Sequence, residues 1–282
     1  MYIAVASGKG GTGKTLVSTS LALCAGECAY VDLDVEEPNG YIFLKPVIEK
    51  EIRCELPVPQ IDEQVCTFCG ECAKACAYNA LMVMKQLKKT LFFADLCHSC
   101  GACAYVCPVK NALKEVKRTI GKISTGKTGT VKFIEGRLDV GRPSGVPLIA
   151  CIINDFLDIN DLLIVDASPG TSCPVVESLK KSDYVILVTE PTPFGLHDLE
   201  LTIEIVKELG KEAGIIINKD NGRSALIEDF AARAGIPVLL KIPYSMDIQR
   251  AYSEGIPLIE AQPGIKEKFK EILKKLTAGI GQ

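Results

Sequence analysis

Gly8-Lys9-Gly10-Gly11-Thr12-Gly13-Lys14-Thr15 is the stretch that decides the fold of this 282-residue chain. It satisfies the pattern G-x-x-x-x-G-K-[ST], follows a β-like run at Tyr2–Ala6 and leads into a helical pattern at Gly13–Ala25. In such a loop the backbone N–H groups turn inward around phosphate oxygens, and the helix N-terminus adds partial positive charge. We expect the whole loop to bind a nucleotide, with Lys14 on the β and γ phosphates and the Thr15 hydroxyl on Mg²⁺. The alternative is a glycine-rich turn without a ligand.

Outside this loop, short runs rich in Ile, Val and Leu alternate with helical patterns. Further strands are expected at Ala29–Leu33, Leu162–Asp166, Tyr184–Thr189, Gly214–Asn218 and Pro237–Ile242. Further helices are expected at Val175–Lys181, Leu196–Leu209, Ser224–Ala234 and Ile265–Leu276. Continuous apolar runs are typical of parallel strands covered on both faces. The pattern therefore predicts an α/β fold with a doubly wound, mostly parallel sheet.

One stretch of about 57 residues, starting near Pro57, breaks this rhythm and indicates an inserted domain. The loop Gly8–Thr15 is called the P-loop below. We expect residues 1–56 to form the first part of the P-loop domain, residues 57–115 to form the inserted domain and residues 116–282 to form the second part of the P-loop domain. After the insert, Lys117–Ile123 and Gly129–Ile134 alternate around Ser124–Lys127 and predict a β-hairpin.

The composition excludes several classes of protein. Apolar residues make up 48% and charged residues 24%, which is typical of a soluble protein with a sizeable core and not of a disordered, collagen-like or coiled-coil chain. A net charge of −3 provides no global basic field, so nucleic acid is not an expected partner. The longest apolar runs, such as Leu148–Ile153, are far shorter than the roughly 18 residues that span a bilayer, so a membrane partner is not expected. No signal peptide follows Met1, and we expect a cytoplasmic protein.

The thirteen cysteines form the second informative pattern. In a chain without an export signal, clustered cysteines indicate metal binding more than disulfides. Eight of them form two copies of one spacing, C-x₂-C-x₂-C-x₃-C, which start at Cys66 and Cys97. This is the bacterial ferredoxin spacing, in which the fourth cysteine of each run binds the other cluster. Zinc in Cys₄ sites is the alternative.

The spacing thus predicts a small α+β ferredoxin-like insert with two four-iron ([4Fe-4S]) clusters. The first set of ligands is expected to be Cys66, Cys69, Cys72 and Cys107. The second set is expected to be Cys76, Cys97, Cys100 and Cys103. The first run departs from the pattern, because Ala77 stands where the second run has Pro108.

The P-loop resembles the deviant Walker A loop of the MinD, ParA and nitrogenase iron-protein ATPases, because Lys9 precedes its glycines. Val31-Asp32-Leu33-Asp34, with Asn39, resembles the first switch of that family. Leu163-Ile164-Val165-Asp166-Ala167-Ser168-Pro169-Gly170 resembles its Walker B strand and second switch. The resemblance implies that Lys9 reaches the nucleotide of a partner chain in a homodimer that forms on ATP binding.

The same resemblance gives roles to three aspartates. It implies that Asp34 orients the attacking water and that Asp32 and Asp166 complete the Mg²⁺ shell. Carboxylates at the ends of adjacent parallel strands are suitably placed for this chemistry. The expected catalytic residues are then Lys9, Lys14 and Asp34. A helix N-cap or turn position is the alternative for Asp32 and for Asp34.

Two further segments resemble the family's adenine-contacting loops. Asn218 ends a strand where the family places an asparagine against the adenine amino group, and Pro243 lies in a weaker match at Ile242-Pro243-Tyr244. Asn221 stands where the GTPase N-K-x-D signature has its aspartate, which favours ATP over GTP.

The chain as a whole resembles MinD-superfamily P-loop ATPases that carry an inserted ferredoxin domain. The resemblance implies ATP, Mg²⁺ and two [4Fe-4S] clusters as cofactors. The leading hypothesis is an ATP-hydrolysing iron–sulfur protein that couples its nucleotide state to electron transfer or to assembly of an iron–sulfur or other metallocofactor. Its partner would be a redox protein or a protein that accepts a cluster.

Two alternatives remain at this stage. A MinD-like positioning or scaffold protein on a membrane or partner surface is one, because Ile265–Leu276 is amphipathic. Docking of this last helix on the sheet explains the same pattern. A redox module with a purely structural ATP site is the other.

Cys173 is a candidate for a redox or transfer role. It lies seven residues after Asp166, and in the nitrogenase iron protein a cysteine at this offset binds a cluster that bridges the dimer. The alternative is a small residue at a helix start, where Pro174 suits the first turn.

Overall fold

The fold was obtained as a computed structural model that describes residues 1–158, 161–262 and 264–278. The chain forms two compact units. Met1–Ile52, Ile123–Arg137 and the chain from Val146 onward form the first, called here the nucleotide unit. Arg53–Lys122 and Leu138–Gly145 form the second, called here the cysteine unit. The cysteine unit is wider than the expected insert at 57–115, because it includes parts of two long strands and a short segment farther along the chain.

The nucleotide unit is built on a sheet whose strands lie in the order β11-β10-β9-β1-β8-β2-β7-β6-β3. Their bounds are β1 Tyr2–Ala6, β2 Ala29–Asp32, β3 Val47–Ile61, β6 Leu113–Thr128, β7 Val131–Leu138, β8 Leu163–Asp166, β9 Tyr184–Thr189, β10 Glu212–Asp220 and β11 Val238–Pro243. Every pair of neighbours from β11 to β7 is parallel. The expected mostly parallel α/β sheet is confirmed, and all six predicted strands lie in it.

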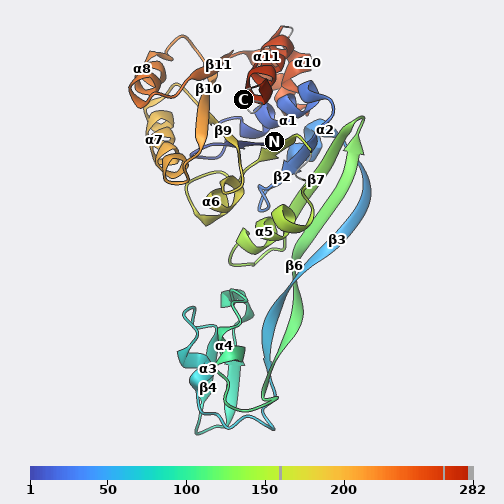
Figure 1. The fold of residues 1–282 in the computed structure, drawn as a ribbon, viewed down its shortest axis with the longest axis vertical. Coiled ribbons are helices and arrows are strands. Elements are labelled where there is room, and N and C mark those ends of the chain that lie inside the picture. Colours follow the sequence, from blue (N-terminus) through green and yellow to red (C-terminus); the bar gives the residue numbers. More distant parts are fainter. Residues whose placement is uncertain (159–160, 263, 279–282) are drawn as a thin grey trace. The chain divides into compact units, whose positions relative to one another are not determined.

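Helices cover this sheet on both faces (Figure 1). Their bounds are α1 Lys14–Ala25, α2 Gly40–Leu44, α5 Val146–Asp155, α6 Cys173–Leu179, α7 Pro193–Glu208, α8 Ala225–Ala234, α9 Met246–Ser253, α10 Leu258–Ala261 and α11 Ile265–Ala278. Helix α1 packs on β1, β2 and β8 and is itself covered by α2, α10 and α11. Helices α6 and α7 pack on β1, β9 and β10, and α5 packs against α6.

The last helix, α11, is part of the core. Its side chains Ile265, Phe269, Ile272 and Leu273 are buried in the same cluster as Ile3 of β1. The apolar face of the amphipathic segment Ile265–Leu276 is therefore buried by packing against α1. Among the described residues, no helix is both long and apolar enough to cross a membrane.

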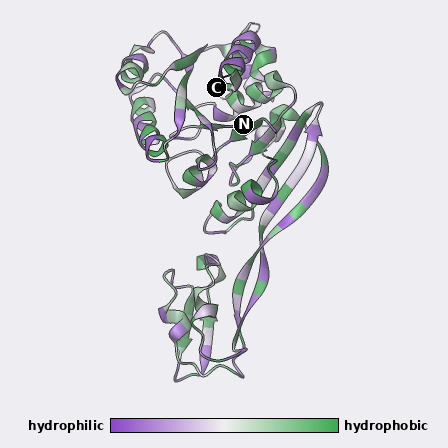
Figure 2. Ribbon diagram, in the orientation of Figure 1, coloured by the Kyte–Doolittle hydropathy of each residue, from purple (hydrophilic) through white to green (hydrophobic). Residues whose placement is uncertain are grey.

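Strands β3 and β6 each run from one unit into the other. Figure 2 shows bands of hydrophobic and hydrophilic residues along both, as expected for strands with one solvated face. The predicted hairpin exists, but its predicted turn at Ser124–Lys127 is wrong. These residues lie inside β6, and the turn comes at Gly129, which has a φ of 57°. The sequence pattern missed β3, the edge strand next to β6, whose Glu49 lies 3.4 Å from Lys127 of β6.

The cysteine unit contains short elements only. They are α3 Glu71–Lys74, β4 Leu81–Met84, β5 Lys89–Phe92, a 3₁₀ turn at Ala94–Leu96 and α4 Ala102–Tyr105. The helices α3 and α4 start at equivalent places in the two cysteine runs, each directly after a glycine with positive φ. The unit is therefore a structural repeat as well as a sequence repeat.

Candidate nucleotide site and cysteine-lined sites

The P-loop connects β1 to α1, and its last glycine shows why the sequence is restricted. Gly13 has a φ of 94° and caps α1. A Cβ at this position would collide with the side-chain amide of Asn218. That amide donates to the Thr12 carbonyl oxygen at 2.7 Å, so a residue of β10 is hydrogen-bonded to the P-loop. The close approach requires glycine at position 13.

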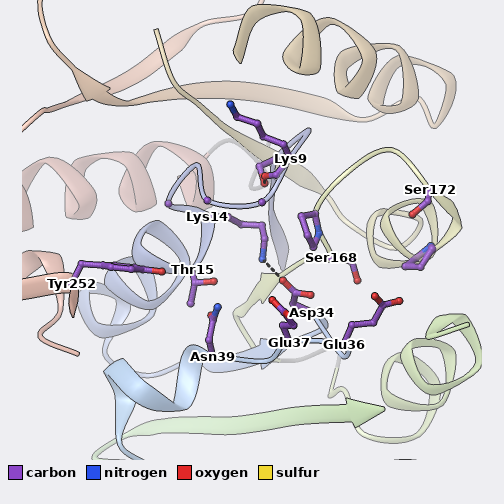
Figure 3. A pocket seen from close by; sticks show the side chains of 16 residues that line it. Lys9, Lys14, Thr15, Asp34, Glu36, Glu37, Asn39, Ser168, Ser172 and Tyr252 are labelled. Carbon is purple, nitrogen blue, oxygen red and sulfur yellow. Dashed lines mark hydrogen bonds and ion pairs between the residues drawn. The ribbon is translucent and has the colours of Figure 1, made fainter. Parts of the chain in front are cut away.

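Lys14 lies close to several carboxylates, of which Figure 3 shows Asp34. Its Nζ is 2.5 Å from Asp166 Oδ1 and 3.5 Å from Asp34 Oδ2, and its side chain is 6% exposed. Burial by itself would lower the pKa of Lys14, but the charges of Asp166, Asp34 and Asp32 outweigh it and raise that pKa. The lysine therefore stays charged, and incoming phosphates compete with these carboxylates for it.

Asp32 and Asp166 are partners across the parallel strands β2 and β8. Both are fully buried. Asp32 accepts hydrogen bonds from the backbone N–H groups of Asp34, Asn39 and Gly40, while Tyr30 donates its hydroxyl to Asp166. Burial, reinforced by the charge of Asp166, raises the pKa of Asp32 well above its ordinary value. Neither aspartate is among the residues that line the cavity described next, although Asp166 contacts Lys14, which is.

Asp34 differs because it reaches the cavity. It follows β2, and burial raises its pKa to about 6 although Lys14 acts in the opposite direction. A carboxylate with a pKa near neutrality is suited to accept a proton from water. Of the three aspartates singled out in the sequence, Asp34 is the one that lines the cavity, and its role toward water stays a prediction.

The cavity beside these groups has a volume of about 240 Å³. Its lining includes Lys9, Lys14, Thr15, Asp34 and Asn39. Among the described residues, the buried side-chain oxygens Thr12 Oγ1 and Asn39 Oδ1 lack a hydrogen-bond partner. Unpaired buried oxygens and inward-facing hydroxyl and carboxylate groups fit the chemistry of a phosphate–Mg²⁺ group.

A second cavity of about 400 Å³ adjoins the first. Asn218 and Pro243, both expected from the sequence, line it together with Leu16, Tyr244 and Ile248. Its mixture of apolar walls and the amides of Asn218 and Gln249 suits a flat base. The two cavities share Gly11, Gly13 and Tyr252.

Sequence reasoning missed several of the lining residues. Tyr252 comes from α9 and Ser168 from the loop after β8, and Ser168 donates to the Leu33 carbonyl oxygen at 2.8 Å. No local motif marks Tyr252, because only the packing of α9 on α10, which itself packs on α1, brings it to the loop. Asn39 is part of the first-switch pattern but was not assigned to the site.

Lys9 does not point into this cavity (Figure 3). Its ammonium lies 3.7 Å from Glu190 Oε2, and its side chain is 36% exposed. Of the expected catalytic residues, the structure brings Lys14 and Asp34 together and leaves Lys9 apart from them.

The eight clustered cysteines line two separate cavities in the cysteine unit. One is lined by Cys66, Cys69, Cys72 and Cys107. The other is lined by Cys76, Cys97, Cys100 and Cys103. Each cavity thus takes three cysteines from one run and the fourth from the other. Among the described residues, no three His, Cys, Asp or Glu side chains are grouped so as to hold a single metal ion.

Backbone pairing explains how the two runs cross over. The Asp62 N–H donates to Ala112 O, and the Phe93 N–H donates to Ala80 O, each at 2.8 Å. The segment before each run is therefore bonded to the segment after the other run.

The thiols themselves receive backbone hydrogen bonds. Cys66, Cys76 and Cys97 each accept an N–H at 3.3 or 3.4 Å. Burial raises the pKa of Cys72, and it raises that of Cys103 to about 11. A buried thiol of this kind becomes a thiolate when a metal takes the place of its proton.

Cys173 is exposed at the start of α6. Its neighbours Ser172 and Pro174 line the first cavity. Cys173 therefore lies where the segment after β8 enters α6, between two residues that line the cavity, and its redox or transfer role stays a prediction.

Comparisons with known proteins agree with this geometry. Residues 3–258 match the CobQ/CobB/MinD/ParA nucleotide binding domain. The chain belongs to this family. It is 31% identical to an uncharacterized protein of Methanocaldococcus jannaschii, over 90% of each chain. It is 23% identical to an iron-sulfur cluster carrier protein of Pyrococcus horikoshii, over 97% of this chain and 84% of that one.

Among solved structures, the septum site-determining protein MinD of Pyrococcus horikoshii, in complex with Mg-ADP, has a similar fold. Its TM-score is 0.59, its sequence identity 22%, and the match covers 99% of this chain and 97% of that one. At this identity the likeness concerns the fold. The chain is a MinD/ParA-family protein with a nucleotide-binding domain.

Proposed function

We propose that this family member is an ATP-hydrolysing iron–sulfur protein that couples nucleotide binding to electron transfer or to the handling of an iron–sulfur or other metallocofactor. The observation that carries the proposal is the presence, in one chain, of a P-loop cavity and of two cavities each lined by four cysteines. A nucleotide switch needs no thiol sites, and a redox module needs no P-loop. Their combination favours coupling.

At the nucleotide site, Lys14 would exchange its carboxylate partners for the β and γ phosphates. Thr12 and the loop's backbone N–H groups would surround the phosphates, and Asp34, ionised above its pKa of about 6, would orient water toward the γ phosphorus. A triphosphate, with more charge than a diphosphate, competes better for Lys14.

Mg²⁺ would be held by the Thr15 hydroxyl, with Asp32 and Asp166 binding it through water. When bound, the ion neutralises charge that develops on the phosphate oxygens. The unpaired Asn39 oxygen is an additional candidate for this hydration shell. The backbone bonds to Asp32 would keep its carboxylate in place.

At the cysteine sites, each set of four thiolates would hold one [4Fe-4S] cluster. A polynuclear cluster needs thiolates spread around a cavity, whereas a single zinc ion needs them to converge on one point. The four-cysteine linings support the first arrangement. The similarity to an iron–sulfur cluster carrier protein supports a role in handling clusters.

The structure gives no support to a scaffold protein that binds a membrane through its last helix. The apolar face of α11, which favoured membrane binding, is buried in the core. Similarity to MinD concerns the fold and carries no argument about membranes.

The test is electron paramagnetic resonance of the anaerobically prepared, reduced protein with and without ATP. We expect signals of reduced four-iron clusters whose shape or midpoint potential changes with ATP, and no such change in Lys14→Ala. Intact clusters that do not respond to ATP in the wild type would refute the coupling. A folded, zinc-only protein after anaerobic reconstitution would refute the cluster assignment.

A further inference from the structure

Glu190 holds two lysines next to the P-loop. It follows β9, and its carboxylate is mostly buried, with 16% of the side chain exposed. Glu190 Oε1 lies 2.6 Å from Lys219 Nζ, and Glu190 Oε2 lies 3.7 Å from Lys9 Nζ. The two oxygens of one carboxylate therefore serve two different cations.

Lys219 is anchored independently of Lys9. Its ammonium also donates to the Gly11 carbonyl oxygen at 2.9 Å, and its backbone adopts a φ of 54°, which is uncommon for a residue with a side chain. With Lys219 tied to both the P-loop and Glu190, the carboxylate stays in place. The contact of Lys9 with Glu190 is longer than that of Lys219, so the ion pair of Lys9 is the one that breaks more easily.

The direction of Lys9 makes this contact relevant to function. Figure 3 shows its side chain extending away from Lys14 and Asp34. Among the described residues, Glu190 is the carboxylate with which Lys9 forms an ion pair. Lys9 can act on phosphates elsewhere only after it leaves Glu190.

We propose that Glu190 is a latch that holds Lys9 on its own chain until the nucleotide of a second copy competes for the lysine. This inference rests on the proposed role of Lys9 across a homodimer. A partly exposed ion pair contributes little energy, so a triphosphate bound to the second copy displaces the single carboxylate easily. An empty second copy offers no such competitor. The latch thus sets how much ATP-bound partner is needed before two chains associate, and Glu190 is a positioning residue for Lys9.

The experiment compares Glu190→Gln with the wild type. Glutamine keeps the size of the side chain and an acceptor for Lys219 but removes the charge that attracts Lys9. Glu204→Gln, on the exposed face of α7, is the matched control. The first measurement is the rate at which an amine-reactive reagent labels Lys9 in dilute protein without nucleotide, followed by peptide mass spectrometry.

We expect Glu190→Gln to raise the labelling rate of Lys9 about two- to fivefold, the effect of a weak ion pair. Labelling equal to that of the wild type and of Glu204→Gln would overturn the latch. The second measurement is dimerisation with a non-hydrolysable ATP analogue by analytical ultracentrifugation. Because a symmetric dimer releases two latches, the protein concentration for half-dimerisation should fall by the square of this factor, about 4- to 25-fold, in Glu190→Gln.

A Lys9→Ala background separates the latch from the expected role of Lys9 across a homodimer. There, adding Glu190→Gln should change dimerisation no further, because the latch has nothing to hold. If Lys9→Ala abolishes dimerisation but Glu190→Gln leaves it unchanged, the latch is wrong and the role of Lys9 stands. If Lys9→Ala dimerises like the wild type, the role of Lys9 across the dimer is wrong.

Discussion

Lys9 and Lys14 lie five positions apart in one loop, yet their surroundings differ. Lys14 is buried among Asp34, Asp32 and Asp166, whereas Lys9 is partly exposed beside Glu190. Two identical side chains are therefore suited to different roles. The buried Lys14 can contact only a ligand in its own cavity, whereas the partly exposed Lys9 can also be reached from outside the chain.

The two lysines should respond differently to truncation. We expect Lys14→Ala to weaken ATP binding about 100-fold, because charge-assisted hydrogen bonds to phosphate contribute up to about 3 kcal/mol. Lys9→Ala should bind ATP within about twofold of the wild type but lose ATP-induced dimerisation and hydrolysis. Isothermal titration calorimetry on dilute protein and sedimentation with an ATP analogue measure both effects. Indistinguishable behaviour of the two variants would contradict separate roles.

Asp34 makes stability depend on pH. Its pKa of about 6 in the folded chain exceeds the ordinary value of 3.8, so between these pH values the folded state binds more protons than the unfolded state. Stability therefore falls as pH rises from about 4 to 6 and stays lower above that range. We expect Asp34→Asn to raise the free energy of unfolding at pH 8, by up to about 3 kcal/mol, with the gain disappearing below pH 4.

Urea unfolding at several pH values, without nucleotide, measures this gain. Asp229→Asn, exposed on α8, is the control and should change stability little at any pH. A destabilised Asp34→Asn at pH 8 would show that the attraction to Lys14 outweighs burial.

At the scale of elements, α1 and α11 show how the nucleotide site is supported. Helix α1 begins at Lys14 and packs against α11, which contributes Phe269 to the core. An element more than 250 residues from the P-loop thus supports the helix that carries its lysine.

Phe269 tests this support. Its side chain is fully buried, and we expect Phe269→Ala to lower the free energy of unfolding of the nucleotide unit by about 3–5 kcal/mol, since it leaves a cavity in the core. Phe194→Ala, at a position that is 78% exposed, should cost less than about 1 kcal/mol. Chemical denaturation followed by circular dichroism compares them. Equal stabilities would mean that α11 is not docked and would restore the argument for a surface-binding helix.

At the scale of the whole molecule, two kinds of site occur in two separate units of one chain. Strands β3 and β6 and the segment Leu138–Gly145 continue directly from one unit to the other. The crossed cysteine sets make the two halves of the repeat depend on each other.

Iron content tests the crossed assignment. We expect about eight irons and eight acid-labile sulfides per chain, from two four-iron clusters. Cys76→Ser and Cys103→Ser should each lose about four irons, and the double variant should lose the same four, because both residues line one cavity. Cys72→Ser combined with Cys103→Ser should lose about eight. Loss of eight irons in the Cys76/Cys103 double variant, with fold retained by circular dichroism, would contradict the assignment.

The amino-acid sequence by itself determined the features that depend on local spacing. The P-loop, the six core strands and the spacing within each cysteine run follow from short-range pattern, because backbone turns and strand burial impose residue types at fixed offsets. Each of the two cavities is lined by three cysteines of one run and one of the other, and the binding of clusters by these sets stays a prediction. The strand β3 and the turn at Gly129 escaped this reasoning, since β3 is mostly exposed and lacks a continuous apolar run.

Only the tertiary structure decided contacts between residues far apart in the chain. Tyr252 at the junction of the two cavities, Asn218 behind the P-loop and Glu190 beside Lys9 are brought there by the order of the strands and the packing of α9. The same packing buries α11 and so assigns its amphipathic face to the core. Such contacts depend on how elements far apart in the sequence pack together, and the hydrophobic periodicity of a single segment does not predict that packing.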